Sequence, residues 1–232
     1  MDFGFTEEQR MLQDSVQRVM NELATPEYVR SCDRDQRFPV ELYRAWVDLG
    51  LLRLPFSQQY GGLDGNVIDM AIMAEAISYK SFDFFTALGA SLFCGLNLNA
   101  KGSDEQKAYW LPKLLSGEVK FSVSMSEPDA GSDVGAMRST AKRHDDDWLI
   151  NGHKLWATSA GAPDNVIHMY VKTDPSAHYR KGMSLFLVDN QSPGLELRKL
   201  EMLGRRCTGT YEIHCSDVRV ANDRLVGGEN NG

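Results

Sequence analysis

The first half of the chain carries apolar residues at helical spacing. The pattern begins at Thr6, which forms a capping box with Gln9, and it is followed by Pro26, which we expect to end the helix. One apolar face repeats every three or four residues, as an amphipathic helix requires. That face consists of Leu12, Val16, Val19, Met20 and Leu23.

The same spacing predicts four more helices before residue 116. The second begins near Pro39 and ends at Gly50, and the third covers Val67–Tyr79. The fourth, Asp83–Ala100, is apolar nearly all round and is expected to be central. The fifth follows a capping box and ends at Leu115. On the third helix, the residues expected to turn inward are Met70, Ala71, Ala74 and Ile77.

The pattern changes near Gly117 to short β-branched or aromatic runs that turn residues separate. Such spacing is typical of a small antiparallel barrel or sandwich. The sequence therefore predicts an α+β multidomain chain, with an N-terminal helical bundle at residues 1–116 and a β domain at residues 117–232. The expected strands are Phe121–Ser126, Trp148–Ile150, His153–Ala157, Val166–Thr173, Ser184–Val188, Leu195–Leu200 and Tyr211–Val220.

Two turns are expected inside the β half. Asn151-Gly152 has the composition of a two-residue hairpin turn and would join the two runs on either side of it. The acidic run Asp145–Asp147 is interpreted as a solvated hairpin turn.

Composition excludes several classes of protein. The 232 residues are 42% hydrophobic and carry a net charge of −7 without a basic cluster, which argues against nucleic-acid binding but not against a phosphorylated ligand. No apolar run reaches the ~18 residues of a membrane span. The first eight residues are acidic where a signal peptide would be basic, so a cytoplasmic location is expected.

The four cysteines predict neither disulfides nor a metal centre. They are widely spaced, with no C-x-x-C pair and no neighbouring histidine pair, and are interpreted as reduced thiols. We therefore expect no metal site. The cysteines are Cys32, Cys94, Cys207 and Cys215.

Two polar segments carry the candidate chemistry. Residues 124–136 read Ser-Met-Ser-Glu-Pro-Asp-Ala-Gly-Ser-Asp-Val-Gly-Ala, and residues 150–161 read Ile-Asn-Gly-His-Lys-Leu-Trp-Ala-Thr-Ser-Ala-Gly. Turns of this composition expose backbone N–H groups and hydroxyls, which suit a phosphate or an electron-rich heteroaromatic edge. Each segment alone is usually a surface turn. The occurrence of both segments in this order, after a helical half, favours a binding site.

Together the two segments resemble the flavin-binding signature of the acyl-CoA dehydrogenases, and the resemblance extends over essentially the whole chain. It implies FAD as cofactor, with the first segment around the flavin edge and the second behind the ring. Ser132 would lie where flavin and the acyl-CoA substrate meet, and Thr158 would hydrogen-bond at flavin N5. The implied cofactor-binding residues are Val123, Ser124, Met125, Ser126, Gly131, Ser132, Trp156, Ala157 and Thr158. Further matching segments are Tyr60–Leu63, Gly102–Lys107, Leu111–Leu114 and Gly117-Glu118.

The sequence departs from the family pattern at three positions. Ser126 stands where threonine is common, Ala157 where a larger aliphatic residue is usual, and Ser159 where asparagine is frequent. Ser126 keeps the hydroxyl and so can keep its role, and the residues at 157 and 159 keep the donor pattern but could alter the pocket. The carboxylates of Glu127 and Asp133 are interpreted as structural rather than catalytic, because each belongs to a turn.

The resemblance implies α,β-dehydrogenation of an acyl-CoA thioester, with hydride transfer from the β-carbon to flavin N5. In most members the catalytic glutamate comes from a further helical domain, so no residue of this chain is assigned as the base. We expect the chain to be truncated and inactive alone. An electron-transferring flavoprotein is the implied electron acceptor, and a homo-oligomer is expected.

Several alternatives stay open. The enzyme could oxidise acyl-CoA or reduce an enoyl-CoA. A flavin-dependent monooxygenase on the same fold, or a non-catalytic fragment that binds flavin or acyl-CoA, would share the same segments. A Rossmann enzyme is disfavoured because no G-x-G-x-x-G follows a predicted strand.

Overall fold

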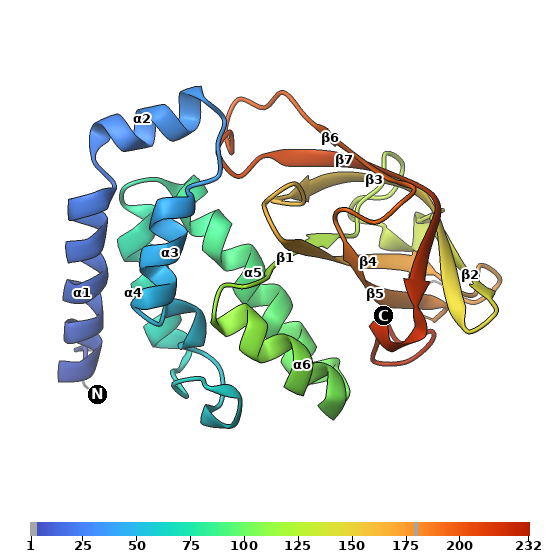
Figure 1. The fold of residues 1–232 in the computed structure, drawn as a ribbon, viewed down its shortest axis with the longest axis horizontal. Helices are drawn as coiled ribbons and strands as arrows, with labels where there is room; N and C mark the ends of the chain where they lie inside the picture. The colour runs from blue at the N-terminus through green and yellow to red at the C-terminus, as the bar shows by residue number, and fades with distance from the viewer. Residues whose placement is uncertain (1–3, 179–180) are drawn as a thin grey trace.

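The computed structural model describes residues 4–178 and 181–232, so the first three residues of the acidic N-terminus lie outside it. Within this part of the chain, six α-helices are followed by a sheet of eight strands, which confirms the predicted α+β fold (Figure 1). The helices occupy one end of the molecule and the strands the other. None of the described helices is both long and apolar enough to cross a membrane.

The helices begin and end largely where caps predict. Thr6 Oγ1 accepts from Gln9 N at 3.2 Å, and Gln9 Oε1 accepts from Thr6 N at 3.2 Å, so the capping box is present. Pro26 does not simply close the first helix: it is the first residue of another, which Thr25 caps and which the sequence analysis missed. The helices are α1 Glu7–Leu23, α2 Pro26–Arg34, α3 Val40–Asp48, α4 Val67–Ser78, α5 Phe82–Lys101 and α6 Asp104–Leu115.

The predicted inward face of α4 is wrong at Ala71, which is exposed, and incomplete at Met70 and Ala74, which are only half-buried. α4 is apolar around most of its circumference, so its periodicity alone defines no single face. Packing against α1 and α5 decides the orientation instead. The buried residues of α4 are Ile72, Met73, Ala76 and Ile77.

The eight strands form one sheet in the order β6-β7-β3-β2-β4-β5-β8, with β1 paired to β4. Most pairs are antiparallel, as expected, but β1 and β4 run parallel, and a single parallel bridge joins β2 to β4. The strands are β1 Lys120–Ser124, β2 Thr140–His144, β3 Asp147–Thr158, β4 Asn165–Lys172, β5 Met183–Asp189, β6 Leu195–Lys199, β7 Thr210–Ala221 and β8 Leu225–Val226.

The predicted hairpin at Asn151-Gly152 is wrong. β3 runs straight through these residues and keeps pairing with β7, with a register shift between Ile150 and Gly152. The irregularity is a β-bulge in β7, where Ser216 and Asp217 both stand opposite Asn151, and Gly152 remains paired with Cys215. The two short runs predicted on either side are therefore one strand. The turn at Asp145–Asp147 is confirmed, because His144 pairs with Asp147 and Asp145 has a φ of 54°.

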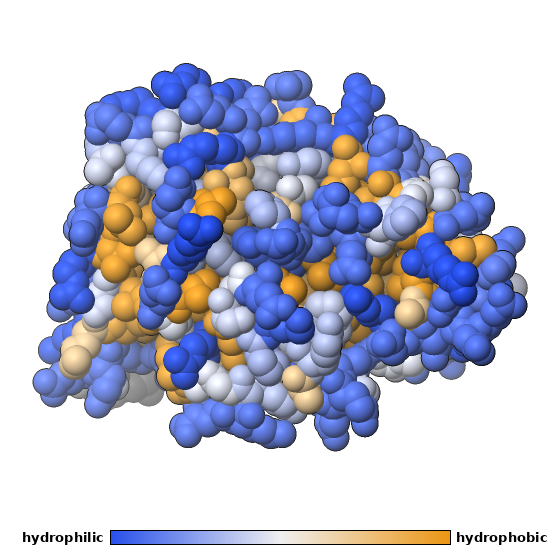
Figure 2. Space-filling model, viewed as in Figure 1, coloured by the Kyte–Doolittle hydropathy of each residue, from blue (hydrophilic) through white to orange (hydrophobic). Residues whose placement is uncertain are grey.

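The hydrophobic core is continuous between the helices and the sheet. One buried cluster contains Trp46 and Leu88 together with Phe121 and Leu187, and a second lies within the sheet around Trp148. All four cysteines are buried, and none of them forms a disulfide. Figure 2 shows apolar side chains in several separate areas of one face, over both the helical end and the sheet end.

Candidate functional site

The two polar segments lie side by side at one end of β1 and β3. Leu155 N donates to Ser126 O at 2.9 Å, which joins the two segments through their backbones. The side chain of Lys154 also joins the two segments. Its Nζ donates to Met125 O at 3.2 Å and to Glu127 Oε1 at 2.8 Å. The structure therefore brings together segments about 30 residues apart in the sequence, as the functional interpretation requires.

Glu127 holds the loop that follows β1. Its carboxylate accepts from Arg138 N at 2.6 Å, from Ser139 N at 3.0 Å and from the buried Lys154. Burial alone would raise the pKa of Glu127, but the hydrogen bonds from Lys154, Ser139 and Arg138 outweigh it and hold the pKa below its ordinary value. These contacts are consistent with the structural role predicted for this carboxylate.

Asp133 also has a structural contact. Its Oδ1 accepts from Gly135 N at 3.1 Å and closes the turn that follows Ser132. Glu127 and Asp133 are thus engaged by the backbone of their own loop, and the third carboxylate of the segment, the exposed Asp129, lies 3.4 Å from Arg138 Nη1.

The predicted cofactor-binding residues divide by exposure. Val123 and Trp156 expose 44% and 54% of their surface, although both are large apolar residues. Ser124 and Ala157 are almost completely buried, so they can contribute to a site mainly by shaping its floor. Gly131 and Ser132 are also exposed, whereas Met125, Ser126 and Thr158 are half-buried.

The exposure of Trp156 has a backbone cause. Lys154 pairs with Ile213 and Ala157 pairs with Tyr211, so Leu155 and Trp156 together stand opposite a single β7 residue. This is a β-bulge, which re-aims a side chain at the cost of regular pairing. Trp156 has a φ of 66°, a sparsely populated conformation for an aromatic residue. Such strain is concentrated at functional sites.

The first segment also carries backbone donors without a protein partner. Within the described residues, the N–H groups of Ser126, Gly131 and Ser132 donate to no other protein group. The site therefore combines exposed apolar surface with available donors, which is what an electron-rich planar ring with a polar edge needs.

A broad cleft adjoins the second segment. Arg205 Nη1 donates to Thr158 Oγ1 at 3.3 Å, and its guanidinium lies 5.6 Å from the ring centroid of Phe82. Arg205 and Phe82 line a cavity of about 760 Å³, together with Asp83 and Cys207. Asp83 Oδ2 accepts from Cys207 N at 3.0 Å and so fixes this wall. No local pattern in the sequence links Arg205 to Thr158, so Arg205 was not among the predicted site residues.

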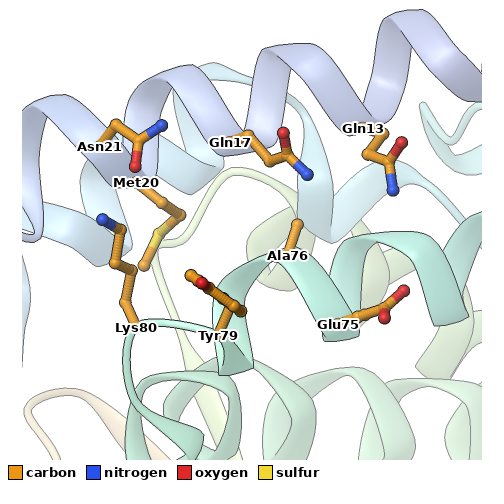
Figure 3. Close-up of a pocket in the computed structure, with 8 residues that line it drawn as sticks. All are labelled: Gln13, Gln17, Met20, Asn21, Glu75, Ala76, Tyr79 and Lys80. Carbon is orange, nitrogen blue, oxygen red and sulfur yellow. The ribbon is translucent and has the colours of Figure 1, made fainter.

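A second cavity lies away from these segments, between α1 and α4 (Figure 3). Its volume is about 310 Å³. Amide side chains from α1 face Glu75, Ala76, Tyr79 and Lys80 at and just beyond the end of α4. Nothing in this set contributes to the candidate site at β1 and β3.

Comparisons with known proteins agree in both halves of the chain. Residues 6–118 match the family model described as acyl-CoA dehydrogenase, N-terminal domain, and residues 122–218 match the acyl-CoA dehydrogenase, middle domain. The mitochondrial isovaleryl-CoA dehydrogenase of Pongo abelii is 34% identical over 234 residues, which cover 99% of this chain and 55% of that protein.

Solved structures give the same picture. A glutaryl-coenzyme A dehydrogenase in complex with glutaryl-CoA matches all of this chain and 59% of its own, with a TM-score of 0.93 and 32% identity. The structure of PigA with FAD and proline matches all of this chain and 61% of its own, with a TM-score of 0.90 and 29% identity. The chain spans little more than half the length of these proteins.

Proposed function

Because this chain belongs to the acyl-CoA dehydrogenase family, we propose that it binds FAD and takes part in the α,β-oxidation of an acyl-CoA thioester. The observation that carries this proposal is the exposed, backbone-strained Trp156, whose neighbour Leu155 is hydrogen-bonded to the loop after Val123, a loop with N–H donors that have no protein partner. The acyl-CoA substrate, like the activity of the whole protein, is inferred from the family.

The described residues fit a flavin. Val123 and Trp156 offer an apolar surface for a planar ring, and the Thr158 hydroxyl and the N–H groups of Ser126 and Gly131 offer donors for its polar edge. When bound, the flavin supplies the hydride-accepting chemistry, and the protein supplies its position and environment. The remaining residues of this proposed set are Ser124, Met125, Ser132 and Ala157.

The protein's own residues have separate tasks in this proposal. Lys154 and Glu127 keep the two segments together, and Ser132 lies at the exposed edge where a substrate thioester would approach. No described carboxylate is assigned as the base: in the first segment Glu127 and Asp133 accept from backbone amides, and Asp129 forms an ion pair with Arg138. We therefore propose that residues 1–232 by themselves support little turnover.

The wider biological setting is also proposed from the family. An electron-transferring flavoprotein is the acceptor class that the family implies, and a homo-oligomer is the expected assembly. We further propose that the helical part at residues 1–116 and the β part at residues 117–232 correspond to two domains.

The test is the visible absorption spectrum of the purified protein after FAD is added and unbound flavin is removed. A retained, shifted flavin band is expected. Trp156→Ala should weaken FAD binding by about tenfold, which corresponds to about 1.4 kcal/mol. Thr158→Ala should shift the band of any flavin that remains.

The matched control is Tyr79→Ala, which removes an exposed aromatic side chain at the end of α4. This variant should bind FAD like the wild type. A folded but colourless wild-type protein would contradict the proposal that these segments hold FAD. Equal FAD affinity in the Trp156→Ala and Tyr79→Ala variants would remove Trp156 from the site.

A further inference from the structure

Two histidines and a glutamate meet on one face of the sheet. His153 on β3 is the register partner of His214 on β7, and Glu212 lies two residues before His214 on the same strand. Side chains alternate along a strand, so residues two apart share a face, and directly opposed residues share it too. Strand geometry therefore brings His153 to two ligand-type side chains that lie about 60 residues later in the sequence.

The three side chains point at a common position. His153 Nε2 lies 2.6 Å from Glu212 Oε1, and His214 Nε2 lies 3.5 Å from the same oxygen. The two imidazole rings stack with their centroids 4.2 Å apart and their planes within 19°. One nitrogen or oxygen from each of the three residues lies within 4.8 Å of the others.

The cluster is open to solvent on one side. The His153 and His214 side chains are 37% and 45% exposed, whereas Glu212 is only 16% exposed. Arg198 Nη1 lies 3.9 Å from Glu212 Oε2 and so engages the oxygen that the histidines do not use. The carboxylate is thereby oriented with Oε1 toward both imidazoles.

We propose that His153, Glu212 and His214 form a binding site for a divalent transition-metal ion of the zinc type. Two imidazoles and one carboxylate are a ligand set that Zn²⁺, Ni²⁺ and Co²⁺ accept, and the exposed side leaves room for a water ligand. Bonds of about 2.0–2.1 Å to each ligand would separate the ligand atoms by about 3.3 Å. Small rotations of the three side chains are enough to change the present distances between the ligand atoms to this value.

The ion would link β3 to β7 next to the bulge that exposes Trp156. Glu212 is the residue opposite the bulge formed by Leu155 and Trp156. A metal ion bound there would hold this irregular pairing together. None of its three ligands belongs to the proposed flavin set, so the metal site is independent of the proposed function.

Isothermal titration of the purified protein with Zn²⁺, repeated with Ni²⁺, tests the site. Saturable binding of one ion per chain is expected. His153→Ala and His214→Ala should each weaken the affinity by at least about tenfold, because each removes one of three ligands. His144→Ala is the matched control, since His144 is also exposed and has its own carboxylate neighbour, Asp145 at 3.6 Å.

Glu212→Gln is the second variant, because it keeps the side-chain shape and removes the anionic ligand. It should weaken Zn²⁺ binding and abolish the rise in melting temperature that Zn²⁺ gives the wild type. Arg198→Ala should leave binding intact or strengthen it. The proposal is overturned if the wild type binds no Zn²⁺ saturably, or if His144→Ala weakens binding as much as His153→Ala.

Discussion

Lys154 and Trp156 show how one residue of backbone irregularity changes what a strand can do. In a regular strand, residues two apart face the same side. Here Lys154 is fully buried and holds Glu127, whereas Trp156 is more than half exposed. The bulge at Leu155 and Trp156 reverses the alternation, so a single short segment both anchors the loop after β1 and presents an aromatic surface.

His168 is a buried residue whose protonation should govern acid stability. It packs against Phe121 with ring centroids 4.8 Å apart, and burial lowers its pKa to about 3 from an ordinary value of 6.5. The folded protein therefore keeps His168 neutral while the unfolded chain takes up a proton below pH 6.5. Stability is complete above pH 6.5 and falls as the pH drops from there toward 3.

Replacing His168 with leucine should remove this loss. Between pH 6.5 and about 4.5, one such group costs the wild type about 2 kcal/mol of unfolding free energy. Urea denaturation at both pH values should show that His168→Leu loses less stability by about this amount. Met169→Leu, a change in a buried neighbour that does not titrate, should keep the wild-type pH dependence. An unchanged profile in His168→Leu would contradict the prediction.

At the scale of elements, β3 depends on a glycine that has the sequence context of a turn. Gly152 has a φ of 153°, and a Cβ placed on it would collide with the Ser139 side chain and come within 2.7 Å of Ser139 Cα. Gly152→Ala should therefore destabilise the protein by about 2 kcal/mol or more, through strain and overpacking between β3 and the start of β2. The measurement is the urea midpoint at constant m-value.

Gly204→Ala is the control for that substitution. A Cβ added to Gly204 would have no atom within 4 Å, so this replacement should change stability by no more than about 0.5 kcal/mol. If both alanine variants unfold at the same urea concentration, the close approach of Gly152 to Ser139 is not a constraint on the fold.

Local signals predicted most elements but not their connections. The capping boxes at Thr6 and Ser103 mark the starts of α1 and α6, because these contacts span only three residues. The turn predicted at Asn151-Gly152 was wrong because the backbone there depends on a distant contact. The partner strand β7, about 60 residues later in the sequence, keeps it extended. The short β2 was missed because three of its five residues are charged or histidine.

In the candidate site, too, the features that depend on local sequence could be predicted and those that depend on distant contacts could not. Residues 124–136 and 150–161 could be found because their composition is unusual over a short stretch. Arg205, which contacts Thr158, and the meeting of His153 with Glu212 and His214 could not be found in this way. Those contacts depend on strand register and loop packing, which a linear pattern does not contain.

At the scale of the whole molecule, the helices and the sheet are joined too closely to act as separate stability units. Ser91 Oγ on α5 accepts from Phe121 N on β1 at 3.0 Å in a fully buried position. Gln106 Nε2 on α6 donates to Leu225 O on β8 at 2.9 Å. Leu187 of β5 also belongs to the same buried cluster as the central helix α5.

We therefore expect the slowest-exchanging amides of α5 and β4 to exchange with the same opening free energy. Native-state hydrogen exchange in low denaturant measures this quantity for each segment. Ser91→Ala should lower both values together by about 1–3 kcal/mol, because it leaves a buried group of Phe121 without its partner. A β4 that opens at a clearly lower free energy than α5 would show instead that the sheet unfolds independently, despite the core they share.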